Sequence, residues 1–264
     1  MSVLTILAIN AAALIGLFLI LWLITLKTRD VTPVDSVWAL GMVALAGTTW
    51  LQTSGDPTRK LLLLVICAIW GVRLGGYLLW RWRQHGPDRR YVVMFGKAHD
   101  AKGWGFGEAS MRMVYATQAP LLFVVCLPVQ LGQIDAVPPV GAIGIAGAVI
   151  AIIGILFETI GDAQLVRFRR NPANQGQVLT TGLWRYTRHP NYFGDACTWW
   201  GLYLIGAESM TGLWAIPGPI LLTWTLMKWS GVPTIEGRLK RKKPGYEDYV
   251  RRTSGFVPWL PKGG

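Results

Sequence analysis

Residues 182–201, GLWRYTRHPNYFGDACTWWG, concentrate polar side chains between two apolar stretches. Pro190 is typical of the first turn of a helix. Asn191, Tyr192 and Asp195 would then lie on one face of that helix. Its N-terminus would offer free N–H groups and a positive potential, which suit a phosphate or a carboxamide oxygen. We therefore expect a ligand site here, with an ordinary cap and interfacial aromatic residues as the alternative. Four neighbouring side chains complete the candidate site: Arg185, Tyr186, Arg188 and His189.

A second group of candidate residues lies in FETIGDAQLVRFRR, at positions 157–170. Glu158 and Asp162 are four residues apart and share one helix face. Two like charges stacked in this way disfavour each other unless a positive group lies opposite. A helix end with snorkelling arginines is the alternative, but it would not require the stacked acids, so we favour a functional site. Three arginines follow within two turns: Arg167, Arg169 and Arg170.

The composition indicates that these residues belong to a membrane protein. Of the 264 residues, 52% are hydrophobic and only 15% are charged, whereas soluble domains carry about 25% charged residues. A membrane-spanning helix needs about 20 apolar residues. We therefore predict an all-α, polytopic integral membrane protein that forms a single domain over residues 1–264. Seven spans are expected, at about 3–27, 36–53, 60–82, 111–133, 140–161, 192–207 and 212–230.

The distribution of basic residues predicts the orientation of the chain. Of the 26 Lys and Arg residues, 23 fall in the predicted inner segments, which are 27–35, 81–112, 163–190 and 228–264. This asymmetry predicts an outer N-terminus and a cytoplasmic C-terminus. The net charge of +12 therefore reflects topology and contact with anionic lipid, and we expect no nucleic-acid partner. A cofactor site would be built at the cytoplasmic face, where the long polar segments lie.

Several other kinds of site find no support in the sequence. Cys67, Cys126 and Cys197 fall in or beside predicted spans and form no CxxC pair, so we expect neither a disulfide nor a metal site. The three histidines are too scattered for zinc. GWGFGEAS, at 103–110, follows no strand and is better interpreted as a flexible loop than as a phosphate-binding loop. The outer loops are short, and no obligate protein partner is evident.

Two motifs resemble the steroid 5-alpha-reductase family, in its bacterial, DUF1295-like branch. They are LTTGLWRYTRHPNYFGDACTWWG, at 179–201, and GYEDYVRRTSGFVPWLP, at 245–261. The resemblance is good over about 140–264 and weak over 1–110. It implies seven helices around a cavity and NADPH bound from the cytoplasmic side. Residues 136–264 would mainly bind the cofactor, and residues 1–135 would mainly face the substrate.

The resemblance implies roles for residues already singled out. Asp162 would contact the cofactor, and Arg169 would hold its adenosine-phosphate part. Asn191 would lie at the nicotinamide carboxamide, with Asp195 in the same constellation. Glu158 falls where the steroid enzymes have an asparagine, which is a departure from the family pattern.

Further departures concern the phosphate side. Gln177 falls where the family has another arginine, and we expect Arg167 and Arg170 to compensate. One of the family's contacts near the tail falls at Glu236, and Arg238 is the nearest phosphate ligand. The cofactor site is therefore expected to draw on both the segment after the fifth span and the tail.

The substrate side is matched less closely. The steroid enzymes polarise a ketone with an acid and a tyrosine, and Asp35, in TPVDSVWALG, is the only acid in a comparable place. We expect its carboxyl, kept neutral in an apolar cavity, to stabilise a developing enolate oxygen; a helix N-cap is an equally good interpretation. The matched tyrosine position falls near Trp70, which has no phenol, and the indole N–H of Trp38 could donate instead. Other donor candidates are Tyr77, Tyr91 and Tyr115.

Together with these residues, the resemblance implies an NADPH-dependent reductase that transfers a hydride to the beta carbon of an enone in a lipid-like ring substrate. The best guess is a 3-oxo-delta-4 steroid, reduced to its 5-alpha product. Five arginines within 163–190 favour NADPH over NADH. An RHP-x-Y helix start with a later acidic residue also occurs in isoprenylcysteine and phospholipid methyltransferases, so methyl transfer from S-adenosylmethionine is one alternative. A lipid-binding or transport protein without catalysis is the other.

Overall fold

The protein is all-α in the computed structural model, which describes residues 1–229 and 231–262. No strand forms among these residues, apart from one β-bridge contact between Thr187 and Ser254. The predicted all-α class is therefore confirmed. The longer helices are α1 (Val3–Thr28), α2 (Pro33–Gln52), α3 (Pro57–His85), α4 (Arg89–Lys102), α8 (Ala142–Arg170) and α9 (Pro190–Gly206). The shorter ones are α5 (Phe106–Ser110), η1 (Met111–Tyr115), α6 (Ala116–Val125), α7 (Leu127–Leu131), η2 (Pro172–Asn174), η3 (Gly182–Arg185), α10 (Met210–Leu213), α11 (Pro217–Trp224), η4 (Thr225–Trp229), α12 (Val232–Lys242) and α13 (Tyr246–Arg252).

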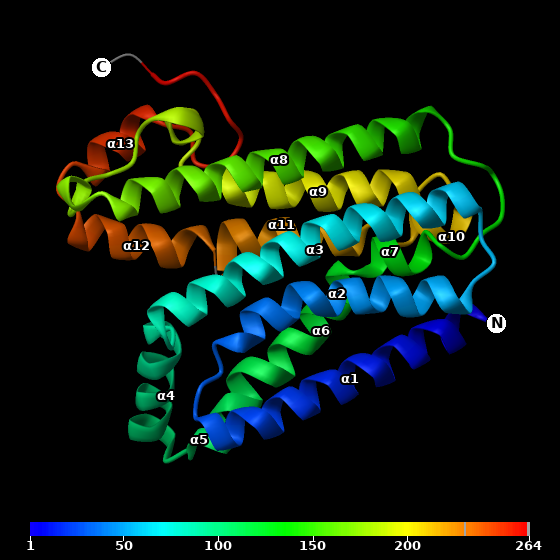
Figure 1. The fold of residues 1–264 in the computed structure, drawn as a ribbon, viewed down its shortest axis with the longest axis horizontal. Coiled ribbons are helices and arrows are strands. Elements are labelled where there is room, and N and C mark those ends of the chain that lie inside the picture. Colours follow the sequence, from blue (N-terminus) through cyan, green and yellow to red (C-terminus); the bar gives the residue numbers. More distant parts are fainter. Residues whose placement is uncertain (230, 263–264) are drawn as a thin grey trace.

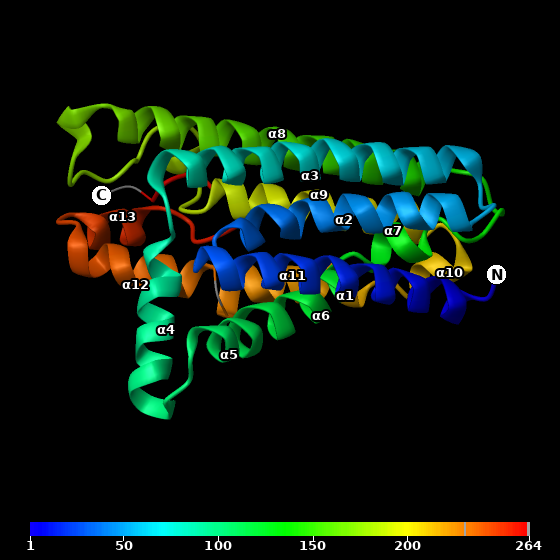
Figure 2. The same cartoon turned by 60° about the horizontal axis from the view of Figure 1, so that its bottom comes forward.

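The long helices lie side by side along one axis, and α4 crosses them near one end (Figures 1 and 2). The same end carries α13, the end of α8 and the end of α12. The start of α1 lies at the opposite end. The segments that the basic residues mark as one side of the membrane therefore gather at one end of the bundle.

Five stretches are long and apolar enough to cross a membrane, so the chain is a multi-pass integral membrane protein. The expected span at 111–133 is instead divided into η1, α6 and α7, with Pro120 inside α6 and Pro128 in the first turn of α7. The expected span at 192–207 corresponds to α9, which has 17 residues. The number seven stays a prediction. The five stretches are α1, α2, α3, α8 and Met210–Arg241.

The end opposite α4 is held together by buried charged groups. Arg59, fully buried at the start of α3, donates from Nε to the carbonyl of Gly132 at 2.9 Å and from Nη1 to that of Pro138 at 2.7 Å. Its neighbour Lys60 donates to the carbonyl of Trp50 at 3.0 Å. The two basic residues of the predicted outer loops thus satisfy loop and helix-end carbonyls, which would otherwise be unpaired.

Helices α8 and α9 approach closely because glycines face each other at seven-residue intervals. Gly147 and Gly154 of α8 lie opposite Gly201 and Gly194 of α9. A Cβ atom on Gly201 would lie 2.4 Å from the carbonyl oxygen of Gly147. Small residues allow helix backbones to approach in membranes, where packing rather than the hydrophobic effect drives association. This contact places the polar residues of the two helices next to each other.

We predict that Gly201→Ala lowers the free energy of unfolding by about 1 to 3 kcal/mol, because the added methyl group would overlap the backbone of α8. Gly76→Ala on α3 is the matched control, since a Cβ there meets no heavy atom within 4 Å. Thermal unfolding of both variants in the same detergent measures the difference. Equal unfolding temperatures would contradict the close α8–α9 contact.

Candidate functional site

A buried ion-pair cluster lies where α3, α8 and α9 meet. The guanidinium of Arg73, on α3, pairs with the carboxylates of Glu158 and Asp162 on α8, and the Nη1 to Asp162 Oδ2 distance is 3.0 Å. The two acids are buried and Arg73 is mostly so. The stacked acids therefore do face a positive group, as their spacing requires. That group comes from α3 and not from the arginines at the end of α8.

Two tryptophans support this cluster. The indole Nε1 of Trp70 donates to Glu158 Oε2 at 3.1 Å. The ring of Trp70 packs edge-on against Trp199 of α9, with centroids 5.2 Å apart. Both tryptophans are fully buried. The apolar rings exclude water from the ion pair, which strengthens its electrostatic interactions.

The first turns of α9 complete the cluster. Asn191 donates from Nδ2 to Asp162 Oδ1 at 3.3 Å. Asp195, one turn later, is buried, and its Oδ1 has no hydrogen-bond partner in the part of the chain that the structure describes. Three carboxyl groups thus surround one guanidinium. An unpartnered carboxyl oxygen at this depth is costly, so the position suits a donor from a bound molecule.

Arg73 was not among the predicted site residues, although the sequence contains a signal for it. Arg73 lies within an otherwise apolar stretch of α3. A charge at membrane depth requires a partner, and two unpaired acids stood in another span. The sequence could not show that these residues meet, because 85 positions separate Arg73 from Glu158.

A second polar group lies at the start of α9. His189 is buried, and its ring stacks on Tyr192 with centroids 5.4 Å apart. His189 Nε2 and Arg188 Nε lie 3.0 and 2.8 Å from Oε1 of Glu236 on α12. Tyr192 lies within range of the charges of both Asp195 and Arg90.

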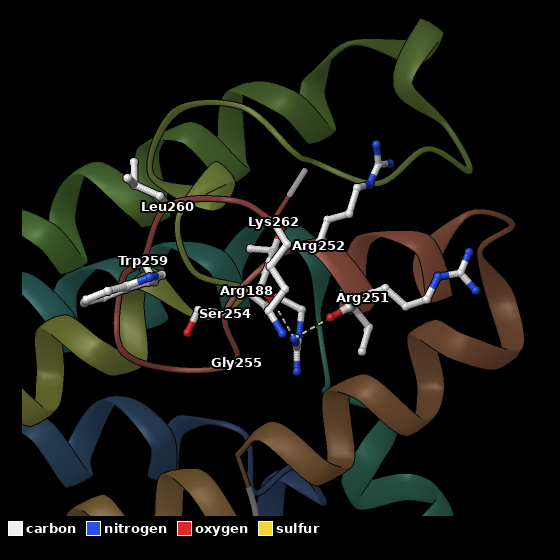
Figure 3. Close-up of a pocket in the computed structure, with 10 residues that line it drawn as sticks. Arg188, Arg251, Arg252, Ser254, Gly255, Trp259, Leu260 and Lys262 are labelled. Carbon is white, nitrogen blue, oxygen red and sulfur yellow. Dashed lines mark hydrogen bonds between the residues drawn. The ribbon is translucent and has the colours of Figure 1, made fainter. Parts of the chain in front are cut away.

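Arg188, one of the predicted site residues, holds the tail in this structure. Its Nη1 donates to the carbonyls of Val250 and Thr253 at 3.1 and 2.6 Å, and Figure 3 shows these contacts at the centre of the tail region. The backbone N–H of Trp259 also donates to the carbonyl of Tyr186 at 2.9 Å. The predicted tail residue Glu236 and the start of α9 thus form one unit.

The remaining predicted arginines lie at the polar end of the bundle. Arg170 places its guanidinium 5.7 Å from the ring centre of Trp80, a cation–π contact. Arg169 lies within range of the charges of Arg81 and Arg238. Most of these side chains are exposed, so they form a basic surface next to the buried cluster. The exposed arginines are Arg167, Arg169, Arg170, Arg185 and Arg238.

Asp35 is neither isolated nor an N-cap. Thr32 occupies the N-cap position of α2, and Asp35 follows in the first turn. The hydroxyl of Tyr91 donates to Asp35 Oδ1 at 2.7 Å, and Arg90 Nη2 lies 3.0 Å from Oδ2. The sequence predicts a lone carboxyl in an apolar cavity. The surroundings differ from this expectation, because α4 supplies a positive partner. The N-cap interpretation is also wrong.

The structure separates the proposed hydrogen-bond donors. Burial, followed by the charge of Asp35, raises the pKa of Tyr91 well above its ordinary value, so this phenol keeps its hydrogen at neutral pH. Trp38 has a buried indole N–H that meets no acceptor among the described residues. Tyr115 is buried and shares a 2.5 Å hydrogen bond with Thr25. Tyr91 is therefore the tyrosine that accompanies Asp35.

We predict that Arg73→Met lowers the free energy of unfolding by about 3 to 5 kcal/mol, because two buried acids lose their common partner. Arg112→Met is the matched control: its pair with Glu108 is exposed, so the loss should stay below about 1 kcal/mol. Adding Glu158→Gln to Arg73→Met should restore part of the stability. Unfolding in detergent checks all three, and equal losses for Arg73→Met and Arg112→Met would contradict a buried cluster.

Comparison with known proteins gives a family and two partial relatives. A stretch of 103 residues is 33% identical to an uncharacterised protein of Schizosaccharomyces pombe and covers 36% of this chain and 28% of that protein. A stretch of 111 residues is 27% identical to the nickel-cobalt-cadmium resistance protein NccN of Alcaligenes xylosoxydans xylosoxydans and covers 42% of this chain and 49% of NccN. The matches thus span less than half the length of either relative. No solved structure matches the chain. The profile of DUF1295, a family described as proteins of unknown function, matches residues 21–253, and the chain belongs to this family.

Proposed function

We propose that the protein is an NADPH-dependent membrane reductase that reduces the C=C bond of an enone in a lipid-like ring substrate. A 3-oxo-delta-4 steroid is the best candidate substrate. The observation that carries the proposal concerns Asp195, which lies one turn after Asn191 in α9. Its buried Oδ1 has no hydrogen-bond partner among the described residues. The resemblance to steroid 5-alpha-reductases supports the choice of cofactor.

Asn191 and Asp195 fit a nicotinamide carboxamide. Asn191 already uses Nδ2 to donate to Asp162, so its Oδ1 is left to accept. Asp195 Oδ1 is a second acceptor. The amide group of nicotinamide has two N–H donors, and these two oxygens would accept their hydrogen bonds. A bound NADPH would supply the hydride, while these residues orient the ring and Trp70 and Trp199 exclude water.

The basic surface at the polar end fits the phosphates. Arginine forks bind phosphate oxygens in pairs, and a 2′-phosphate adds nearly two negative charges. Arg169 and Arg238 lie close enough to act together. Arg188 is engaged with Glu236 and the tail, so we assign it a positioning role. The residues proposed for the phosphate side are Arg167, Arg169, Arg170, Arg185 and Arg238.

Tyr91 and Asp35 are proposed to act at the substrate carbonyl. The enone oxygen gains negative charge as hydride arrives at the beta carbon, and a positioned donor stabilises that charge. Tyr91 keeps its hydrogen because burial and Asp35 raise its pKa. Asp35 pairs with Arg90 and accepts the hydrogen bond that orients the phenol. We therefore transfer the donor role from Asp35 to Tyr91, with Trp38 and Tyr115 outside the reacting group.

We further propose the orientation and span count that the sequence favours. The end that carries α4 and α13 would face the cytoplasm, and NADPH would enter from that side. The N-terminus would lie on the opposite, outer side. Positive residues favour that side of the membrane. The divided helix α6–α7 and the short helix α9 would provide two crossings in addition to the five long apolar stretches, which makes seven. Broken helices are tolerated at membrane depth when they are buried in protein.

Methyl transfer is the second candidate because His189 Nε2 lies 3.0 Å from Glu236. The RHP-x-Y methyltransferases combine such a histidine with a later acidic residue. S-adenosylmethionine would then use the same helix start. The buried Asn191–Asp162 pair and the unpartnered Asp195 fit a carboxamide better, so we favour the reductase.

We predict that purified wild-type protein retains NADP(H), because Oδ1 of the buried Asp195 has no hydrogen-bond partner among the described residues, and that Asn191→Ala and Asp195→Ala lose it while still folding. Asp100→Ala is the matched control, since this acid is exposed on α4. Mass spectrometry of the released nucleotide and thermal unfolding are the measurements. S-adenosylhomocysteine in the wild type would contradict the reductase and favour methyl transfer, and neither nucleotide would favour a non-catalytic lipid-binding protein.

We predict that Tyr91→Phe lowers kcat with an enone steroid by about 100- to 1,000-fold, because one oxyanion donor is lost. Asp35→Asn should have a smaller effect, and NADPH affinity should be unchanged in both. Tyr115→Phe is the comparison, since its hydroxyl bonds to Thr25 and its loss should reduce stability, not turnover. An active Tyr91→Phe with an inactive but folded Tyr115→Phe would place the donor at Tyr115.

A further inference from the structure

The last described residues combine exposed apolar side chains with positive charge. Trp259 and Leu260 are 73% and 74% exposed, and Val257 is 58% exposed. Between positions 249 and 262 the chain contains no acidic residue and three basic ones. An exposed apolar patch bordered by charge indicates an interaction surface. The basic residues are Arg251, Arg252 and Lys262.

Hydrogen bonds and ring contacts fix this segment on the rest of the protein, so its apolar side chains are exposed in an ordered position. Thr187 donates from Oγ1 to the carbonyl of Phe256 at 2.7 Å, and Trp259 N–H is bonded to Tyr186. The ring of Phe256 contacts Phe193 of α9, with centroids 6.0 Å apart, and Phe193 contacts Phe157 of α8 at 5.4 Å. The tail therefore lies against the two helices near their polar ends, next to the lipid-facing surface of α8.

The apolar and basic side chains point in different directions. Figure 3 shows Trp259 and Leu260 projecting from one side of the tail, and Arg251 and Arg252 from the opposite side. A hollow of about 320 Å³ lies in this region and is lined by Arg252, Lys262 and neighbouring residues. Arg251 pairs with Asp248, which leaves Arg252 and Lys262 as the charges open to a ligand.

We propose that residues 252–262 form an interfacial anchor that binds anionic phospholipid in the bilayer surrounding the protein. Val257, Trp259 and Leu260 insert at the boundary between headgroups and acyl chains, where tryptophan is favoured. Arg252 and Lys262 bind the lipid phosphate. The charge complementarity of an acid-free basic segment beside an apolar patch selects an anionic lipid surface over a neutral one.

The anchor also has a consequence for the start of α9. The same tail residues bind Thr187 and Arg188 through backbone carbonyls. Those residues lie four and three positions before Asn191. Lipid bound to the tail therefore fixes the position of the loop that leads into the buried cluster, whatever molecule that cluster binds.

An environment-sensitive NBD fluorophore at position 259 tests the anchor. The probe is attached to Trp259→Cys in a Cys197→Ala background, because Cys67 and Cys126 are buried. Gln175→Cys in the exposed loop after α8 is the matched control. Labelled full-length protein is placed in phosphatidylcholine vesicles with and without phosphatidylglycerol. Doxyl-labelled lipid should quench the probe at 259 and not at 175, and phosphatidylglycerol should increase the quenching. Arg252→Gln and Lys262→Gln should each lower the ratio of lipid-bound to free tail in vesicles with phosphatidylglycerol about fivefold.

Three results would overturn the proposal. Emission and quenching at 259 equal to those at 175 would show that the tail stays in water. Equal quenching with and without phosphatidylglycerol would contradict the selection of an anionic lipid. A shift at 259 in detergent on adding inorganic phosphate, as large as that caused by phosphatidylglycerol, would assign the hollow to a soluble anion. Val257→Cys carries the same probe if Trp259→Cys does not fold.

Discussion

The ion pair of Arg73 with Glu158 and Asp162 constrains the arrangement of the membrane helices. A guanidinium at membrane depth is stable only when carboxylates and hydrogen bonds replace water. Arg73 meets both acids, which sets the rotation of α3 and of α8 about their axes. Trp70 adds its indole bond to Glu158 from the same helix. A rotation of α3 or of α8 away from this arrangement would leave a buried charge without a partner.

The third helix joins this pair through close backbone contact. Gly154 and Gly194 bring α9 against α8 so tightly that a side chain at either position would overlap a carbonyl. Asn191 then reaches Asp162, and Asp195 is enclosed with an oxygen that no described residue satisfies. Asp162 therefore belongs both to the packing of the bundle and to the candidate site. A ligand bound there would stabilise the fold by a free energy that rises with the logarithm of the ligand concentration divided by its Kd.

Local patterns in the sequence predicted the helical class and the faces of the site, because both depend on short spacings. Glu158 with Asp162, and Asn191 with Asp195, lie four residues apart and share a face in the structure as expected. The partners of these residues could not be predicted. Arg73 meets the acids only through tertiary packing, and Arg90 and Tyr91 reach Asp35 because α4 folds back across the bundle end. The acceptors of Arg188 could not be predicted for the same reason, since they lie in the tail.

The central claim is that the buried cluster of α3, α8 and α9 receives the nicotinamide. Trp70 and Trp199 lie in or beside this cluster, so their excitation should transfer energy to a nicotinamide bound at Asp195. Titrating NADPH into purified protein in nanodiscs, while recording nicotinamide emission after tryptophan excitation, measures this directly. Saturable sensitised emission is expected in the wild type and in the Asp100→Ala control, and none is expected in Asp195→Ala. Absence of sensitised emission in the wild type, or emission unchanged in Asp195→Ala, would contradict this site.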